Sequence, residues 1–288
     1  MPVKVSPTLT SYLQVGPLLL VLLLFFGIPL LVIIAYSFFQ FDGLDSVPAF
    51  DFVNYIDVLT SGVTLSLYMK TLYYAVVVWT ITLLIGFTVA YFLAFHVKSL
   101  IWQMALLLLC TVPFWTSNII RMISWIPFLG RNGIFNNALI AAGITDQPLE
   151  FLLFSDFAVI IAYVHLFTLF MIVPIFNSMA RIDKSLIEAA HDGGASAWNV
   201  IVDIVIPLSR TGIALGSIFV ITLVMGDFFV VKVMSGSQSA SIAMAMSNQI
   251  AMVQYPPAAA SAVILLIVVS LMVAAILRVV DVRKEIAG

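Results

Sequence analysis

Asp227 is a carboxylate within an otherwise apolar stretch of the chain, and it is the only acidic residue in residues 211–231. Ionisable residues inside such stretches are costly and are functional candidates by default. A carboxylate facing a water-filled path would attract a cationic solute, and Tyr163 is a second candidate for such a path. The alternative for Asp227 is an ion pair with Lys232. His165, close to Tyr163 in sequence, is expected to be a hydrogen-bonded packing residue.

A strip of aromatic and polar residues lies farther up the chain: Trp115, Asn118, Arg121 and Trp125. In a helix these residues would form one strip at the outer mouth of a membrane path. Aromatic faces attract organic cations by roughly 0.5–2 kcal/mol each. The alternative is an interfacial aromatic belt, which membrane helices commonly carry. Arg121 would repel a cation, so it is expected to serve gating or to pair with an acid.

A polar segment, residues 179–209, predicts two short helices separated by a turn. Asp183 is a favourable N-cap and strong helix formers follow it. Gly194, after Gly193, suits the left-handed conformation in which many helices end. Ser196 can cap the second helix, which is expected to end before Pro207.

The first of these helices carries small side chains, Ala189 and Ala190, beside the charge of Glu188. Small side chains allow another protein to approach closely, and a charge can orient the contact. The segment therefore fits a docking surface for a soluble partner, and the alternative is an ordinary solvated loop.

The composition requires a membrane around these residues. Of 288 residues, 63% are hydrophobic and 9% charged, whereas soluble domains carry about 25% charged residues. Net charge is −2, which argues against a nucleic-acid partner. Six segments are long and apolar enough to span the bilayer as helices, and we expect an all-α integral membrane protein with a single transmembrane domain over residues 1–288. The six segments are residues 16–39, 72–95, 100–120, 157–175, 211–231 and 258–277.

Basic residues beside the spans predict the orientation, because cytoplasmic loops are enriched in Lys and Arg. The larger of two sets of basic residues would lie on the cytoplasmic side of the membrane. This places both termini in the cytoplasm and the loops 41–66 and 121–155 outside. A short helix is expected after Arg131-Asn132-Gly133. The larger set is Lys4, Lys98, Arg181, Lys184, Arg210, Arg278, Arg283 and Lys284.

Enzymatic motifs are missing from the sequence. No Gly-x-x-x-x-Gly-Lys-[Ser/Thr] motif is present to bind a nucleotide. An intramembrane hydrolase could use Ser217 and His165, yet neither Gly-x-Ser-x-Gly nor His-Glu-x-x-His occurs. No catalytic or metal-binding residues are therefore expected. An ion-coupled carrier is a stronger rival, although internal pseudo-symmetry is absent.

The polar segment resembles the EAA loop of binding-protein-dependent ABC importer permeases. That pattern is Glu-Ala-Ala, three residues, Gly, nine residues, Ile, one residue and Leu-Pro. Here Ile206 replaces the Leu, which is a conservative apolar change. The matching residues are Glu188, Ala189, Ala190, Gly194, Ile204 and Pro207.

Further stretches are similar to the polyamine (spermidine/putrescine) branch of that family. They are residues 115–121 with Trp125, and residues 130–137, 226–229 and 255–260. Branch members for other solutes share these stretches in part. The resemblance therefore implies a polyamine first, and otherwise an aminophosphonate, an opine or amino-acid derivative, iron or thiamine.

The resemblance also implies an architecture and a set of partners. The fold would be that of a type I (MetI-like) importer permease with six spans, in the inner membrane of a bacterium. The chain would pair with a second six-span permease, expected to be a different one. A periplasmic binding protein would deliver the solute, and two cytoplasmic ATPase subunits would bind ATP and Mg, leaving this chain without a cofactor. The EAA-loop residues would couple ATP hydrolysis to the spans.

Overall fold

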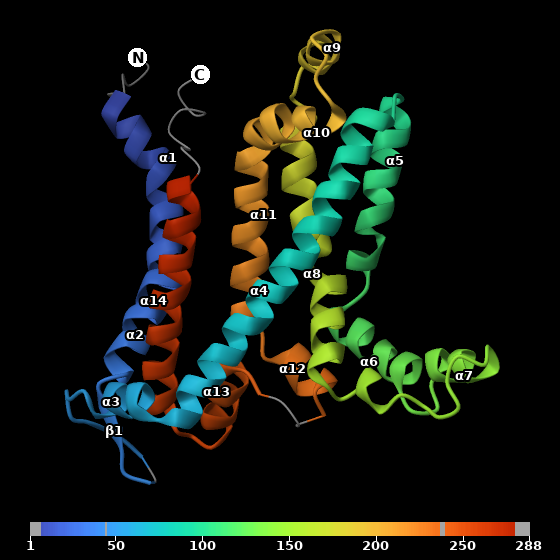
Figure 1. Cartoon of the computed structure of the whole chain (residues 1–288). Helices are drawn as coiled ribbons and strands as arrows, with labels where there is room; N and C mark the ends of the chain where they lie inside the picture. The colour runs from blue at the N-terminus through green and yellow to red at the C-terminus, as the bar shows by residue number, and fades with distance from the viewer. Residues whose placement is uncertain (1–6, 44, 237–239, 280–288) are drawn as a thin grey trace. The chain divides into compact units, whose positions relative to one another are not determined.

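The computed structural model describes residues 7–43, 45–236 and 240–279 and is mainly helical (Figure 1). By its internal contacts the chain divides into two units. The first is Met1–Leu65 with Ala245–Ile267, and the second is Ser66–Met244 with Val268–Gly288. The single transmembrane domain expected from the sequence stays a prediction, and the basic residues Lys4, Arg283 and Lys284 lie outside the described residues.

The elements follow the chain in a nearly unbroken series of helices. The α-helices are α1 (Pro7–Leu22), α2 (Ile28–Tyr36), α3 (Val53–Thr60), α4 (Gly62–Tyr91), α5 (Leu100–Thr111), α6 (Asn118–Leu129), α7 (Ile134–Ala141), α8 (Asp156–Met179), α9 (Lys184–Asp192), α10 (Ala197–Val200), α11 (Ile206–Gly226), α12 (Phe229–Met234), α13 (Ile242–Ala251) and α14 (Tyr255–Val279). The π-helical turns are η1 (Leu23–Gly27), η2 (Phe92–His96) and η5 (Ile201–Val205), and the 3₁₀ turns are η3 (Val112–Trp115) and η4 (Glu150–Leu152). The strands are β1 (Phe39–Phe41) and β2 (Ser46–Pro48).

Five helical segments of the described chain are long and apolar enough to cross a membrane, and a bent pair would make a sixth. The all-helical membrane fold expected from the sequence is confirmed, with the number of spans at five or six. The five segments are Gln14–Tyr36, Gly62–His96, Asp156–Met179, Ala197–Gly226 and Tyr255–Arg278.

The third expected span, residues 100–120, is not one straight helix. It breaks after Trp115, and the next helix sets off at 86° to the first. Pro113 lacks the N–H that a helix needs, and the chain tightens there into a 3₁₀ turn. Thr116 is extended, and the Ser117 side chain then accepts the N–H of Ile119 to begin α6.

The first unit contains a β-hairpin where the sequence predicted only a loop. Strands β1 and β2 are antiparallel, with Gln40 opposite Val47. Asn54, on α3, holds this hairpin to the end of α2. Its amide donates to the carbonyl oxygens of Ser37 at 3.0 Å and Phe39 at 2.6 Å. The segment is therefore folded locally, through backbone groups that hydrophobic patterning does not reveal.

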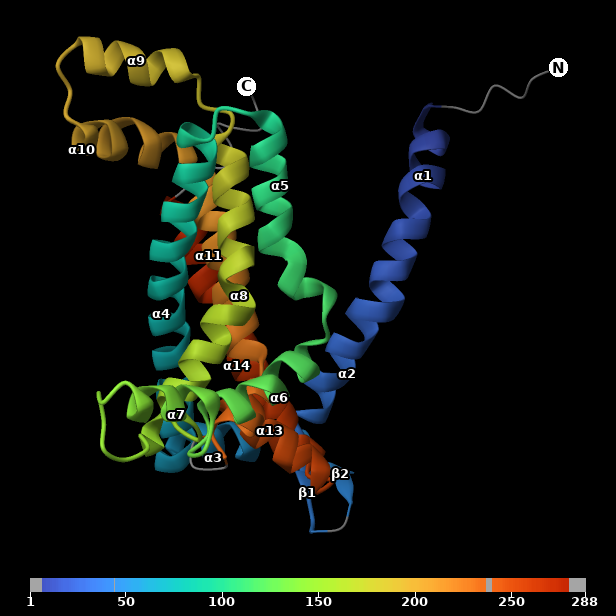
Figure 2. The ribbon, with the colours of Figure 1, turned by 90° about the vertical axis from the view of Figure 1, so that its right-hand side faces the viewer.

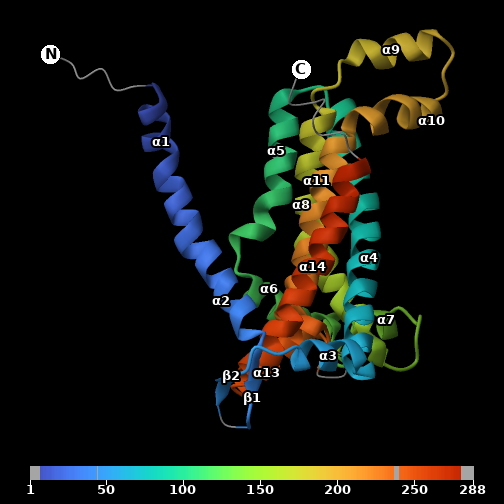
Figure 3. The ribbon, with the colours of Figure 1, turned by 90° about the vertical axis from the view of Figure 1, so that its left-hand side faces the viewer.

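The second unit is built around α8. Its buried residues are mostly apolar and include Val159, Met171 and Ile175. Helices α4, α5 and α11 lie alongside it (Figures 2 and 3). Many apolar side chains on the outer faces stay exposed, such as Leu84 at 65% and Leu109 at 63%. Such surfaces suit lipid or a membrane partner rather than water.

The segment between α5 and α8 is an ordered arm containing α6 and α7. The expected short helix after Gly133 is confirmed as α7. Asn136 is fully buried, and its amide donates to Gly130 O and Leu149 O while its Oδ1 accepts the N–H of Leu149. One side chain thus ties the returning chain to the turn before α7.

Candidate transport site and coupling loop

The coupling loop, which we define as residues 179–209, forms the two short helices that the sequence predicts. The Asp183 side chain accepts the N–H of Ser185 at 3.0 Å and begins α9. Gly194 has a φ of +83°, a conformation that favours glycine. Ser196 then accepts the N–H of Asn199 and begins α10. All three predicted roles are confirmed.

Helix α9 projects beyond the ends of α4 and α8, as one arm of a hairpin with α10 (Figure 2). It has no buried residue, and Glu188 and Ala189 are exposed while Ala190 is half-buried. Two large apolar side chains, Leu186 at 49% and Trp198 at 70%, are also exposed there. Neither residue was predicted as a docking residue, although a large apolar side chain in a polar loop is a signal that could have found both.

We expected the second helix of the loop to end before Pro207, but it continues past this proline. It runs from α10 through η5 into α11 as one segment, Ala197–Gly226. A proline ring normally collides with the carbonyl four residues earlier, here that of Asp203. In the wider π turn the N–H of Ile206 donates to Ile201 O, which lets the helix pass Pro207. Ile204 lies half-buried inside this turn.

Helix α11 packs closely against α8 at two glycines, as the Gly-x-x-x-Gly spacing indicates. A Cβ on Gly212 would lie 2.3 Å from the carbonyl oxygen of Pro174, and one on Gly216 would lie 2.7 Å from the sulfur of Met171. At Gly212 the nearest atom belongs to the backbone of α8, so no side chain fits there without moving a helix, whereas at Gly216 the Met171 side chain would have to move. The coupling loop is therefore joined to a tightly packed pair of helices.

Asp227 lies beyond α11 rather than inside a span, which corrects its expected position. The helix stops at Gly226 and Asp227 is extended, with ψ at 130°. The Asp227 carboxylate accepts the N–H of Val230 at 2.8 Å and so caps the start of α12. Gly and Asp both favour a helix break here, because glycine has low helix propensity and aspartate bonds local backbone. Within the described chain, no ion pair joins Asp227 to Lys232.

Tyr163 is buried against Asp227 instead of facing open space. Its hydroxyl donates to Asp227 Oδ1 at 3.3 Å, and its side chain is 1% exposed. Its ring meets that of Tyr74 edge-on, at 6.4 Å between centroids. Asp227 itself is half-buried. The geometry brings together two of the residues that the sequence named separately.

A second carboxylate belongs to the same cluster, which we call the tyrosine–carboxylate cluster (Tyr74, Tyr163, Asp156, Asp227 and Lys70). Tyr74 donates to Asp156 Oδ1 at 2.6 Å, and Lys70 pairs with Asp156 Oδ2 at 3.1 Å. Sequence reasoning missed Lys70, Tyr74 and Asp156, because α4 and α8 are brought together only by the fold. The cluster joins α4 and α8 to the end of α11 that is remote from the coupling loop.

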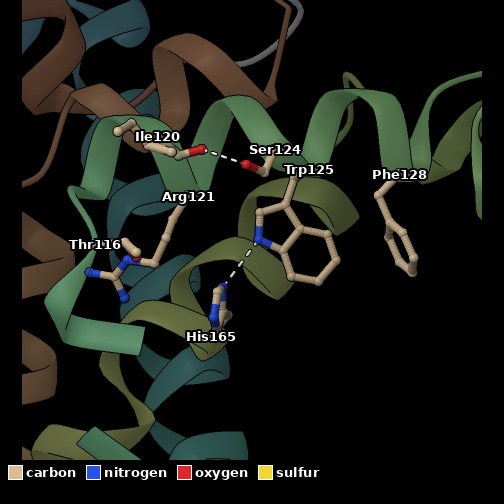
Figure 4. Close-up of a pocket in the computed structure, with 7 residues that line it drawn as sticks. All are labelled: Thr116, Ile120, Arg121, Ser124, Trp125, Phe128 and His165. Atoms are coloured by element: carbon tan, nitrogen blue, oxygen red, sulfur yellow. Dashed lines mark hydrogen bonds between the residues drawn. The ribbon is translucent and has the colours of Figure 1, made fainter. Parts of the chain in front are cut away.

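The predicted strip of four residues divides in two. Arg121 and Trp125 line a hollow of about 380 Å³ with Thr116, Ile120, Ser124, Phe128 and His165 (Figure 4). The Trp125 indole donates to Nδ1 of His165 at 3.2 Å, which confirms the hydrogen-bonded role expected for that histidine. Trp115 is 77% exposed and does not line the hollow. Asn118 accepts a hydrogen bond from Arg121. The helix break before α6 is why the four do not form one strip.

Comparison with known proteins gives clear relatives. No family model matches the chain. The spermidine/putrescine transport system permease protein PotB of Salmonella typhimurium is 34% identical over 234 residues, covering 81% of this chain and 80% of its own length. PotB of Escherichia coli is 34% identical over 237 residues, covering 81% of this chain and 84% of its own length.

A solved structure shares the fold. It is a bacterial alginate ABC transporter in complex with an alginate pentasaccharide-bound periplasmic protein. One of its chains matches with a TM-score of 0.73 at 16% identity, covering 93% of this chain and 92% of that one. The likeness agrees with the expected permease fold.

Proposed function

Because this chain belongs to the family of spermidine/putrescine ABC importer permeases, we propose that it forms half of a membrane path through which an ATP-driven importer carries polyamines. Members of this family are transport subunits and not enzymes. The chain would pair with a second permease in the inner membrane of a bacterium, with both termini in the cytoplasm. A periplasmic binding protein would deliver the polyamine, and an ATPase dimer would hold ATP and Mg.

The observation that carries this proposal is the continuous helix Ala197–Gly226, which joins the coupling loop to the residue before Asp227. The segment bends where α10 meets α11 (Figure 2), and the 21 residues of α11 alone are about 32 Å long. Movement imposed at the coupling loop would therefore reach Asp227 with little loss, because α11 has no break before Gly226. The close contacts at Gly212 and Gly216 would carry α8 with it.

The coupling loop would dock on the ATPase subunits through α9. Glu188 and the small Ala189 and Ala190 would seat in a groove, and the apolar Leu186 and Trp198 would supply buried area. Tryptophan is enriched among residues that dominate interface energies. Gly194, Ile204 and Pro207 would hold the geometry of the hairpin and its exit into α11.

Asp227 and the tyrosine–carboxylate cluster would receive the cargo. Polyamines are flexible chains of protonated amines, which bind carboxylates and the negative faces of aromatic rings. Asp227 is half-buried, so a cation beside it is less screened than in water. Tyr163 is covered in this structure and would meet the cargo after α11 has moved. Trp115, Asn118 and Trp125 would lie along the approach.

The test is uptake by the complete importer in proteoliposomes, with the binding protein added. Radiolabelled spermidine should accumulate with ATP and not with a non-hydrolysable analogue. Asp227→Asn should lower uptake about tenfold at limiting spermidine, because a charge-assisted contact of roughly 1.5 kcal/mol is lost. The matched control is Asp146→Asn, at an exposed position. Uptake without ATP would refute the importer, and unchanged kinetics in Asp227→Asn would remove Asp227 from the path.

A further inference from the structure

Lys70 is the one charged residue of α4, which belongs to a segment apolar enough to cross a membrane. A charge in such a segment is costly and is a functional candidate by default. The Lys70 Nζ lies 3.1 Å from Asp156 Oδ2, and the Tyr74 hydroxyl donates to the other oxygen of that carboxylate at 2.6 Å. One oxygen of Asp156 is thus held by a tyrosine and the other by an alkylammonium group. The proposed function uses the carboxylate but gives Lys70 no role.

The Asp156 carboxylate does not depend on Lys70 for its charge. Asp156 is the first residue of α8, and the Ser155 side chain caps this helix by accepting the N–H of Ala158 at 3.2 Å. The N-terminus of a helix stabilises a negative charge. Tyr74 donates a hydrogen bond to the carboxylate as well. Asp156 therefore keeps two stabilising interactions when Lys70 moves away.

The ion pair between Lys70 and Asp156 is open to exchange. The two side chains are 32% and 43% exposed. Ion pairs in contact with water are weak, because solvent screens the charges and a long side chain loses freedom when it is held in one place. A second cation can therefore replace Lys70 at Oδ2 of Asp156 without movement of a helix.

The group that now binds Asp156 has the chemistry of the proposed cargo. A lysine side chain is a primary ammonium at the end of a flexible four-carbon chain. The aminobutyl end of spermidine or putrescine is the same chemical group. A position that holds Lys70 Nζ beside the Tyr74 hydroxyl therefore suits the end of a polyamine through the same contacts.

We propose that Asp156 binds one terminal ammonium of the polyamine and that Lys70 competes with the cargo for this position. Lys70 pairs with Asp156 while the path is empty, and it moves into water when the cargo ammonium takes its place. Because one cation replaces another, the cargo is held less tightly than it would be by an unpaired carboxylate. Weaker binding suits a path that the cargo must leave again. This inference rests on the proposed function, in which the cargo is a polyamine.

The first experiment measures the affinity of the permease itself. Purified importer in lipid nanodiscs binds radiolabelled spermidine in the absence of the binding protein. Lys70→Met removes the ammonium and keeps an unbranched side chain. It should lower the Kd about three- to fivefold, because a screened ion pair is formed only a few times more often than it is open. The matched control, Lys232→Met, removes the same charge at an exposed position and should change the Kd much less.

The same change is then made together with Asp156→Asn. Asp156→Asn alone should bind spermidine more weakly than the unmodified importer, and adding Lys70→Met should bring no gain, because the two cations no longer share a carboxylate. If Lys70→Met tightens binding equally with and without Asp156→Asn, Lys70 acts by general repulsion and the exchange is refuted. Unchanged or weaker binding in Lys70→Met alone would make the pair a structural link between α4 and α8, which also overturns the proposal.

A chemical rescue compares samples of one variant, so differences in folding do not enter. Lys70→Cys is combined with Cys110→Ala, which removes the one natural cysteine of the chain. Aminoethyl methanethiosulfonate attaches an ammonium at position 70 and should raise the Kd to that of the unmodified importer. Methyl methanethiosulfonate attaches a neutral group and should not. Equal Kd values after the two reagents would contradict the exchange, and Cys110→Ala alone controls for cysteines of the other subunits.

Uptake separates this inference from the proposed function. ATP-driven uptake of spermidine by the unmodified importer, with the binding protein present, is measured in parallel. If uptake is absent, the proposed cargo is wrong and the exchange at Asp156 falls with it. If uptake is normal and the Kd does not respond to Lys70, only the exchange is wrong.

Discussion

Replacement of Gly212 by alanine is the sharpest test of how α8 and α11 pack. The added Cβ would lie 2.3 Å from Pro174 O, 2.6 Å from Ser178 Oγ and 2.9 Å from the Cα of Ile175. The Ser178 side chain can rotate away, but the other two atoms belong to the backbone of α8. The new methyl group therefore cannot be accommodated by side-chain movement alone.

The size of the effect follows from these distances. Contacts between heavy atoms are most favourable at about 3.5–4.0 Å, so the two helices would have to separate by roughly 1.2 Å at this point. Overpacking of this kind typically costs about 1–3 kcal/mol. The ratio of folded to unfolded chain would fall about 5- to 150-fold.

The matched control is Gly226→Ala, at the last residue of the same helix. A Cβ there meets nothing within 4 Å, so the change should stay within about 0.5 kcal/mol. Both variants are unfolded reversibly in mixed micelles with increasing denaturing detergent, and helix content is followed by circular dichroism. If Gly212→Ala is as stable as Gly226→Ala, then α8 and α11 do not approach as closely as described.

Three further changes test the loop and the arm. Gly194→Ala should slow ATP-driven uptake, because a φ of +83° would cost an alanine about 1–2 kcal/mol. Gly193→Ala should be tolerated, because the φ of Gly193 is −75°. Equal uptake by the two variants would contradict this prediction. The hydrogen bond from the Ser185 backbone lowers the pKa of Asp183, so its cap should stabilise α9 above about pH 4 and be lost as pH falls through the lowered pKa. Amide-exchange protection of α9 should then fall in acid in the unmodified chain and stay low at every pH in Asp183→Ala. Asn136→Ala should destabilise the arm by about 1–3 kcal/mol, because buried backbone groups lose their hydrogen-bond partner. Proteolysis within residues 121–155 should then be faster. The control Asn137→Ala, at an exposed position, should leave the rate of proteolysis unchanged.

Local features of the structure could be predicted well from the sequence. Asp183, Gly194 and Ser196 act within a few residues of themselves, through a side-chain cap or a backbone angle, so their roles depend little on the rest of the fold. The long apolar segments were located for a similar reason, because the length needed to cross a bilayer is a property of one segment. The docking role of Glu188, Ala189 and Ala190 in the EAA pattern stays a prediction.

Breaks in the helices were harder to predict, because a proline has more than one outcome. Pro207 was expected to end a helix, and a π turn carries the helix past it. Pro29 follows another π turn in the same way, with the N–H of Ile28 donating to Leu23 O. At Pro113 the chain instead tightens into a 3₁₀ turn and bends. Which outcome wins depends on the packing on either side, which one sequence does not display.

By itself, the sequence determined that the chain lies in a membrane, that its spans are helical and that the loop before α11 resembles a coupling loop. These follow from composition, segment length and local spacing. Only the tertiary structure decided that Tyr163 bonds Asp227, that Tyr74 and Lys70 meet Asp156, and that Trp125 bonds His165. Those contacts join residues far apart in the chain, and they exist only because α4, α6, α8 and α11 pack at particular rotations and heights.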